Sequence, residues 1–573
     1  MGRNRSQKLA KLLNITKLQK LAKLLNIAKL QKLAKLQKLA KLQKLAKLQK
    51  LLNLAKLSLR SKFFRKLSGL LKIQTEMEYT EQNRTRLTTQ CRRICLCLLM
   101  LIPMLLMAQQ KKHEFRGAWI QCVNGQFKGI GTERMQQTLS YQLDELQKDG
   151  CNAIIFQVRP ECDALYESRL EPWSFYLTGE QGEAPVPYFD PLQWMVEQCH
   201  QRGMELHAWI NPYRAKTKTP HRNAENHVVV QHLDRCFEYD GLILLNPALK
   251  ENRDYICEVT RDIVERYDID GLHIDDYFYP YPSPGIMIPD DDDFRSNNAG
   301  FEDQGDWRRH HVDLFIKQMS ETIHKAKPWV KFGVSPFGIY RNQKSHPDGS
   351  RTNGLQNYDD LYADIMLWVD RGWIDYCVPQ LYWEIGNRAA DYDELIHWWN
   401  DHCARVPLFI GEDVERTVKF SQQAQKMALH DELPNVKGTV LWYAKAAVDN
   451  VGDYGTALRN KYWSKPVLQP LMPWIDKRGP KKPAKLKILP IDDKLVAFWT
   501  APKGRGWKDE PVGYVVYRFE KGEPVNLDDA SKILTITRET HYELPQVAEG
   551  TYVVTAFDRL NNESKPAKQK VKF

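Results

Sequence analysis

Short apolar runs alternate with longer amphipathic stretches from Glu114 to about Trp463. The short runs have the length of buried strands, and the longer stretches repeat apolar residues at the three- and four-residue spacing of a helix face. Eight strands are predicted, over Gly117–Val123, Ala153–Val158, Glu205–Ile210, Gly271–Asp275, Lys331–Val334, Ile374–Leu381, Pro407–Ile410 and Gly438–Trp442. The predicted helices between them are Met135–Lys148, Pro191–Arg202, Tyr255–Tyr267, Trp307–Ala326, Tyr358–Arg371, Tyr392–Ala404 and Ser421–Leu429.

Eight strand-then-helix units in a segment of this length predict an α/β fold. We expect a (β/α)8 TIM barrel with long loops over residues 114–465. The alternative is an open doubly wound sheet, but no glycine-rich dinucleotide-binding loop follows the first predicted strand.

The pattern changes after the barrel. Five prolines crowd residues 466–483, which predicts a stiff linker because proline at this density stops helices. In residues 484–573, short alternating runs separated by turn residues predict a small all-β sandwich that folds independently. Its predicted strands are Lys494–Trp499, Gly513–Phe519, Ser531–Ile536 and Gly550–Phe557. The segments Y-V-V-Y-R and T-Y-V-V-T-A-F-D resemble a fibronectin type III domain.

The formal net charge of +12 is concentrated at the N-terminus. The first 72 residues hold 21 of the 83 basic residues and none of the 71 acidic ones, so the remainder is net negative and not suited to nucleic acid. From Lys29 to Lys50 a K-L-Q-K-L-A hexad repeats, and its leucines wind around a helix instead of facing one partner. We therefore expect residues 1–76 to be a spurious extension; the alternative is a cationic helix at a membrane surface.

Residues 77–108 have the pattern of a secretory signal peptide. Met77 is followed by four arginines, an apolar run over Ile94–Met107 and the small residue Ala108. The run is short for a membrane-spanning helix, although an uncleaved anchor is the alternative. We expect an exported protein, periplasmic or extracellular, with a mature N-terminus near Gln109 and no stable membrane insertion.

No cofactor site is predicted in the exported part. Its eight cysteines form no C-x-x-C pair and have no spacing typical of zinc, so buried free thiols are expected, although export would permit disulfides. The acidic run Asp290–Asp293 lacks the spaced ligands of a calcium loop and is expected to be a solvated loop. We predict no metal and no organic cofactor.

Polar and aromatic residues gather where the predicted barrel strands end. Barrels of this kind hold their catalytic groups at the C-terminal ends of the strands. Carboxylates, amides and aromatic rings at these positions suit a sugar, because rings cover its apolar face and polar groups bind its hydroxyls. The candidate sugar contacts are Arg159, Asp163, His207, Asn211, Tyr213, Tyr382, Trp383 and Trp442; for each of them structural packing is the alternative.

Strand alternation selects a candidate catalytic carboxyl group. His273 and Asp275 share one face of the fourth predicted strand, and Ile274 and Asp276 share the other. Ile274 belongs beneath the helices, so His273 and Asp275 are expected to point into the barrel. Asp275 is our first candidate; Asp276 could replace it, or could orient the site or cap the loop.

Five motifs carry a family resemblance: R-G-A-W-I, Q-V-R-P-E-C-D-A-L-Y, H-A-W-I-N-P-Y-R, G-L-H-I-D-D-Y-F-Y-P-Y and W-I-D-Y-C-V-P-Q-L-Y-W. In this order, over residues 114 to about 460, they resemble the glycosyl hydrolase-like family 10 of secreted bacterial proteins. The resemblance implies a (β/α)8 barrel with glycosidase activity. Characterised relatives include an enzyme that cuts peptidoglycan glycan strands stripped of their peptides, so the expected partner is a polysaccharide or cell-wall glycan.

Glycoside hydrolysis normally requires two carboxyl groups, one protonated and one ionised. Asp275 fits the nucleophile or base, and Glu384 is the leading candidate for the general acid. The alternatives for the acid are Glu161, Asp163 and Glu412, of which Glu412 could instead pair with Arg416. Two other functions stay open: hydrolysis of another polysaccharide, and carbohydrate binding without turnover.

Overall fold

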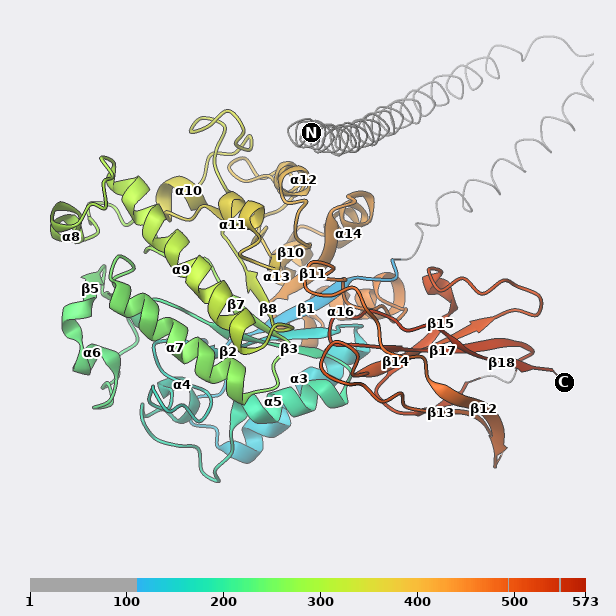
Figure 1. Ribbon diagram of the computed structural model, residues 1–573. Coiled ribbons are helices and arrows are strands. Elements are labelled where there is room, and N and C mark those ends of the chain that lie inside the picture. Colours follow the sequence, from blue (N-terminus) through green and yellow to red (C-terminus); the bar gives the residue numbers. More distant parts are fainter. Residues whose placement is uncertain (1–110, 493, 546–547, 573) are drawn as a thin grey trace, which may run out of the picture. The chain divides into compact units, whose positions relative to one another are not determined.

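The structure, a computed structural model, describes residues 111–572 except 493, 546 and 547. The expected extension and signal peptide lie outside these residues. Eight parallel strands close into a barrel and follow one another around it in chain order, which confirms the predicted TIM barrel (Figure 1). The strands are β1 (Phe115–Ile120), β2 (Ala153–Arg159), β3 (Glu205–Ile210), β7 (Gly271–Ile274), β8 (Lys331–Val334), β9 (Tyr376–Cys377), β10 (Leu408–Asp413) and β11 (Val436–Trp442).

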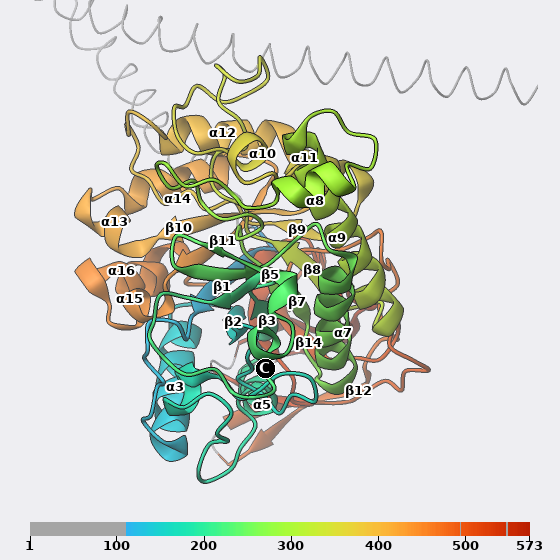
Figure 2. The same ribbon diagram turned by 90° about the vertical axis from the view of Figure 1, so that its left-hand side faces the viewer.

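Helices surround the barrel (Figure 2). The longer ones are α3 (Thr132–Lys148), α5 (Pro191–Gln201), α7 (Lys250–Arg266), α9 (Gln304–Ala326), α12 (Tyr392–His402) and α14 (Gln423–Glu432). The single helix predicted over Tyr358–Arg371 is wrong: α10 (Asn357–Asp360) and α11 (Ile365–Arg371) are separate, and Tyr362 between them has a positive φ of 55°. Shorter helices are α4 (Phe175–Thr178), α6 (Val228–Gln231), α8 (Asp291–Ser296), α13 (Val414–Lys419), α15 (Ala444–Val448) and α16 (Tyr454–Ala457).

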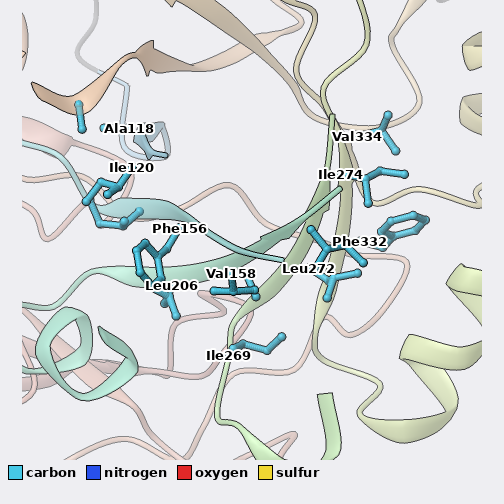
Figure 3. Close-up of a cluster of buried hydrophobic side chains, with 14 of the residues drawn as sticks. Ala118, Ile120, Phe156, Val158, Leu206, Ile269, Leu272, Ile274, Phe332 and Val334 are labelled. Atoms are coloured by element: carbon cyan, nitrogen blue, oxygen red, sulfur yellow. The ribbon is translucent and has the colours of Figure 1, made fainter. Parts of the chain in front are cut away.

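Alternating strand residues divide between two cores. The outward-facing residues pack beneath the helices, as Figure 3 shows for Leu272 and Ile274 of β7 beside Phe332 and Val334 of β8. The inward-facing residues form a second, aromatic cluster inside the barrel, which includes Phe115, Trp119, Trp209, Tyr376 and Phe409. The predicted outward position of Ile274 is confirmed, and alternation places the residues on either side of it inside the barrel.

Two features of the loops were not expected from the sequence. A small antiparallel sheet of β4 (Arg214–Lys216), β5 (Cys236–Tyr239) and β6 (Leu242–Leu245) follows β3. The predicted solvated loop over Asp290–Asp293 is wrong for its first residue, because Asp290 is fully buried and paired with Arg308 at 2.5 Å. A buried counter-charge makes that burial tolerable.

The C-terminal region is an all-β sandwich, as predicted. One sheet has the order β12-β13-β16 and the other β15-β14-β17-β18. The strands are β12 (Ala484–Ile491), β13 (Lys494–Thr500), β14 (Gly513–Phe519), β15 (Ile533–Thr537), β16 (His541–Leu544), β17 (Gly550–Phe557) and β18 (Ala567–Val571).

The sandwich and the segment before it pack against the N-terminal end of the barrel. Met472 and Leu560 belong to the buried cluster inside the barrel. Arg559 of the sandwich pairs with Asp268 at 2.8 Å, just before β7. The indole N–H of Trp474 donates to Asp375, just before β9, at 2.9 Å. The predicted linker is therefore part of an extensive interface that closes the end of the barrel opposite to the expected active site.

The eight cysteines of the described chain are free thiols, and all except Cys236 are buried. None of the helices in the described ranges is long and apolar enough to span a membrane.

Candidate active site

Asp275 follows β7 directly and lies in the mouth of the barrel. The indole N–H of Trp209, on β3, donates to Oδ2 of Asp275 at 3.2 Å, while Oδ1 is buried and has no hydrogen-bond partner among the described residues. Burial, and then the charge of Asp276, raise the pKa of Asp275 to about 8, and Arg214 opposes the rise. The carboxyl group therefore carries a proton at neutral pH, and its unpaired oxygen can present that proton to a ligand.

Asp276 begins the loop after Asp275. Its Oδ2 accepts a hydrogen bond from the hydroxyl of Tyr281. Burial raises the pKa of Asp276, while Tyr281 and Arg214 favour the ionised form. The guanidinium of Arg214 stacks 3.8 Å from the centre of the Tyr277 ring. Two adjacent buried carboxyl groups near one cation can together hold one proton and one negative charge.

Aromatic rings from separate strands and loops meet at the mouth. The ring of Trp442 stacks on Tyr382, with the centroids 5.9 Å apart and the planes at 21°. Its edge contacts Trp119 at 6.2 Å and Trp209 at 6.4 Å. Trp442 and Tyr382 are only partly buried, so they can offer ring surface to a ligand. Such surfaces are suited to the apolar face of a sugar.

A chain of hydrogen bonds runs from Trp119, one of these aromatic residues, through the barrel interior to Glu205. Trp119 Nε1 donates to Nε2 of His273 at 3.3 Å, and Nδ1 of His273 lies 3.2 Å from the hydroxyl of Tyr376. That hydroxyl lies 2.7 Å from Nδ1 of His207, whose Nε2 contacts Glu205 at 3.0 Å. With both imidazoles neutral, each donor meets an acceptor in one direction, from Trp119 to the carboxylate.

The surroundings of His273 and Glu205 shift the pKa values of these two members of the chain. Burial lowers the pKa of His273 well below its usual value, which keeps the imidazole neutral. Burial alone would raise the pKa of Glu205, but Lys331 and His207 outweigh burial and lower the pKa. The ammonium of Lys331 lies 2.7 Å from Oε1 of Glu205. The chain thus ends on a buried carboxylate with its own counter-charge.

The comparisons with known proteins agree with this architecture. The profile of the family described as glycosyl hydrolase-like 10 matches residues 114–428, which is more than half of the chain. The chain belongs to the glycosyl hydrolase-like 10 family.

Relatives extend the match beyond the family profile. Glycosyl hydrolase YngK of Bacillus subtilis is 38% identical over 491 residues, which cover 81% of this chain and 94% of YngK. Glycosyl hydrolase DigH of Escherichia coli K12 is 35% identical over 370 residues, covering 58% of this chain and 84% of DigH. Among solved structures, the PgaB (BpsB) glycoside hydrolase domain of Bordetella bronchiseptica aligns with 61% of this chain and 99% of its own at 10% identity. Its TM-score of 0.41 adds nothing to the fold assignment.

Several predicted residues come together in the mouth of this glycosyl hydrolase-like barrel. Asp275, Asp276, Tyr382 and Trp442 form the group described above. Asn211 lies two residues after Trp209 on the same strand face; its Oδ1 accepts the backbone N–H of Arg214 at 3.0 Å, and its buried Nδ2 has no partner among the described residues. Trp383 is partly buried and contacts Phe337, with the centroids 5.4 Å apart.

Other predicted sugar contacts have structural partners instead. Arg159 is fully buried, pairs with Glu171 at 2.6 Å and donates to the backbone oxygen of Asn211. Asp163 accepts hydrogen bonds from the backbone N–H of Phe175 and from Gln181, and so holds the loop after β2.

Two further candidates lie away from the sugar-facing surface. His207 lies two residues before Trp209 on the same face of β3, and it belongs to the hydrogen-bond chain. The ring of Tyr213 is fully buried and packs against Phe315 of α9 at 5.1 Å, in the layer between strands and helices.

Glu384 does not have the environment of a general acid. Its small burial would raise its pKa, but hydrogen bonds from its own backbone and Asn387, together with the charge of Arg416, lower the pKa. Asn387 donates to Oε1 at 2.8 Å, and Arg416 lies 3.9 Å from Oε2. The carboxyl group is therefore ionised at neutral pH, and this geometry disfavours the predicted acid role.

Two other candidate acids, Glu412 and Glu161, have partners within the fold. Glu412 pairs with Lys426 of α14 at 2.7 Å, and not with Arg416 as considered from the sequence. Oε1 of Glu161 accepts hydrogen bonds from the Tyr176 hydroxyl and from the backbone N–H of Thr217. Its Oε2 is buried without a hydrogen bond to the described residues, 3.5 Å from Nε2 of His221, and burial raises the pKa of this carboxyl group. Within the described ranges, no group of three or more His, Cys, Asp and Glu side chains is placed to hold a metal ion.

Sequence reasoning missed four residues of the mouth: Trp119, Trp209, Arg214 and Asp413. The first three stand inside the motifs R-G-A-W-I and H-A-W-I-N-P-Y-R. Applying to their strands the alternation used for Asp275 would have found Trp119 and Trp209. Arg214 belongs to the unpredicted strand β4, so no signal in the sequence placed it beside Tyr277.

Proposed function

We propose that this protein is an exported glycoside hydrolase that cleaves glycan strands of bacterial peptidoglycan. The observation that carries the proposal is the environment of Asp275: a buried carboxyl group with a raised pKa, one unpaired oxygen and a group of aromatic rings beside it. An acid that keeps its proton at neutral pH is the group that a glycosidic oxygen needs in order to leave.

The assignment of Asp275 changes from the one expected from the sequence. A nucleophile or base must be ionised, whereas burial and the charge of Asp276 keep Asp275 protonated. Asp275 is therefore the general acid in this proposal. Tyr382 and Trp442 hold the sugar ring, and Asn211 and Arg214 supply hydrogen-bond donors to its hydroxyls.

Peptidoglycan and export rest on the family resemblance and on the signal-peptide pattern of residues 77–108. The strand order of the sandwich supports the fibronectin type III resemblance. Fractionation of cells that express the full chain tests export: the protein should be recovered outside the cytoplasm, beginning near Gln109. Recovery in the cytoplasm with the lysine-rich repeat intact would contradict this part of the proposal.

Hydrolysis is tested by incubating the protein with peptide-free peptidoglycan strands and, in parallel, with chitin and cellulose oligosaccharides. Mass spectrometry should find shorter strands with new reducing ends from peptidoglycan. Cleavage of another polysaccharide alone would identify that polysaccharide, and not peptidoglycan, as the substrate. Binding without any product would favour a carbohydrate-binding barrel.

A further inference from the structure

Asp413 ends β10 on the face that points into the barrel. Phe409 of the same strand lies in the inner cluster. A Cβ added to Gly411 would meet the ring of Trp119 at 3.1 Å, so this residue also faces inward. Glu412, between Gly411 and Asp413, points outward to Lys426 of α14. Alternation then directs Asp413 inward, at the C-terminal end of the barrel where Asp275 lies.

Aromatic rings connect the positions of the two aspartates in the mouth. Strands β8 and β9 separate β7 from β10 in the closed barrel, so their ends stand on different sides of the mouth. Asp413 is the register partner of Trp442, whose ring contacts Trp209, the residue that donates to Asp275. Burial and the charges of Asp276, Asp413 and Asp275 all raise the pKa of Tyr382. Tyr382 therefore lies within the electrostatic influence of both aspartates.

The carboxyl group of Asp413 retains a free oxygen. Oδ1 accepts the backbone N–H of Arg416 at 2.8 Å and so caps α13. Oδ2 makes no hydrogen bond within the described part of the chain. Burial raises the pKa of Asp413, and this hydrogen bond and the charges of Arg416 and Lys426 oppose part of the rise. Asp413 is partly exposed, in contrast to the buried Asp275, so the two carboxyl groups have different surroundings and the free oxygen of Asp413 is accessible to water.

We propose that Asp413 is the second catalytic carboxyl group of this site, acting on the anomeric carbon from the side of the sugar opposite to Asp275. The proposal rests on the function proposed above. It supplies the second carboxyl group that hydrolysis requires, as nucleophile or base. The sequence analysis gave that role to Asp275 and sought a general acid among Glu384, Glu161, Asp163 and Glu412.

The chemistry balances with water as the only co-reactant. Asp275 gives its proton to the glycosidic oxygen as the bond from that oxygen to the anomeric carbon breaks. In a one-step route, Asp413 takes a proton from water while the water oxygen bonds to the anomeric carbon. In a two-step route, Asp413 itself bonds to that carbon, and water, deprotonated by Asp275, later displaces it. The anomeric configuration of the first product distinguishes the routes.

The competing explanation is that Asp413 only caps α13. The substitution Asp413→Asn separates the two, because asparagine is as good a helix cap as aspartate but carries no charge. Asp303→Asn is the matched control, since Asp303 caps α9 in the same way through the backbone N–H of Asp306 at 2.8 Å. On peptide-free glycan strands we expect kcat to fall on the order of a thousandfold for Asp413→Asn and to be unchanged for Asp303→Asn.

Azide rescue gives a readout that a purely structural role would not move. In Asp413→Ala, azide can take the space of the lost carboxylate and attack the anomeric carbon, so turnover should recover in part with a glycosyl azide as product. Full activity of Asp413→Asn in a protein whose wild type cleaves the strands would overturn the inference. Inactive Asp276→Asn in the same assay would then assign the second carboxyl group to the neighbour of Asp275. If the wild type cleaves no glycan, the proposed function fails first.

Discussion

At the scale of single residues, the mouth of the barrel contains carboxyl groups whose surroundings shift their pKa away from its value in water. Asp275 is the main example, because burial and the adjacent Asp276 raise its pKa to about 8. A raised pKa of a carboxyl group stabilises the fold only while the group is protonated. This contribution is complete below the usual pKa of 3.8 and is lost as the pH rises through about 8. Removing the charge should therefore stabilise the protein and inactivate it together.

The first prediction concerns stability. Asp275→Asn should increase the free energy of unfolding at pH 8 by ~1–4 kcal/mol, because asparagine avoids the cost of ionising a buried carboxyl group. The gain should shrink towards pH 5, where the wild-type group keeps its proton. Urea unfolding at both pH values measures the difference. A variant less stable than the wild type at pH 8 would mean that the carboxyl group is well solvated or well paired.

The second prediction concerns the pH dependence of activity. If Asp275 is the general acid, kcat/KM should fall as the pH rises through about 8, because the proton needed by the leaving oxygen is lost. This alkaline decrease in kcat/KM should disappear in Asp275→Asn when the substrate is a 4-nitrophenyl glycoside, because its leaving group needs no proton. A profile that stays flat to pH 10 would contradict the assignment.

At the scale of elements, the barrel strands could be predicted well because each is a short, fully buried apolar run. The bounds of β3 and β8 agree with the prediction residue for residue. Strand β10 runs three residues further than its apolar run, to Asp413, because it continues the parallel ladder with β11, a contact distant in sequence. Because the predicted strand ended at Ile410, the alternation of inward and outward residues was not extended to Asp413. Asp275 could be found because Ile274 marks the outward face.

The third prediction tests the hydrogen-bond chain between these strands. Tyr376→Phe removes the hydroxyl between His207 and His273 and leaves two buried nitrogens unpaired, at a cost of ~1–3 kcal/mol in the free energy of unfolding. Tyr358→Phe is the control, since the Tyr358 hydroxyl makes no hydrogen bond within the described residues. Urea unfolding should separate the two variants. Equal stability would show that water replaces the missing hydroxyl.

At the scale of the whole molecule, the sandwich forms part of the barrel's own core. Its Leu560 is buried with the inner aromatic residues, and its Asn561 donates to Glu205, where the hydrogen-bond chain ends, at 3.3 Å. The sequence led us to expect an independent sandwich because proline density marks a linker but does not tell what the linker packs against. The interface instead favours cooperative unfolding of the two domains.

The fourth prediction follows from that interface. Leu560→Ala should lower the free energy of unfolding by ~2–4 kcal/mol, because it leaves a cavity in the barrel's inner core. Leu489→Ala is the control, since Leu489 is 47% exposed in the same sandwich. Calorimetry should show one transition for the wild type. Two separate transitions, with Leu560→Ala shifting only the one of the sandwich, would restore the independent domains expected from the sequence.

The most direct test of the central claim is the turnover of peptide-free peptidoglycan strands by the wild type and by Asp275→Asn, followed through new reducing ends. The account predicts cleavage by the wild type and a loss on the order of several powers of ten in kcat for the variant, with substrate affinity changed much less. Near-normal turnover by folded Asp275→Asn would contradict it. If Asp276→Asn were inactive instead, the acid would be Asp276, and if both variants were active, β7 would have no part in the chemistry.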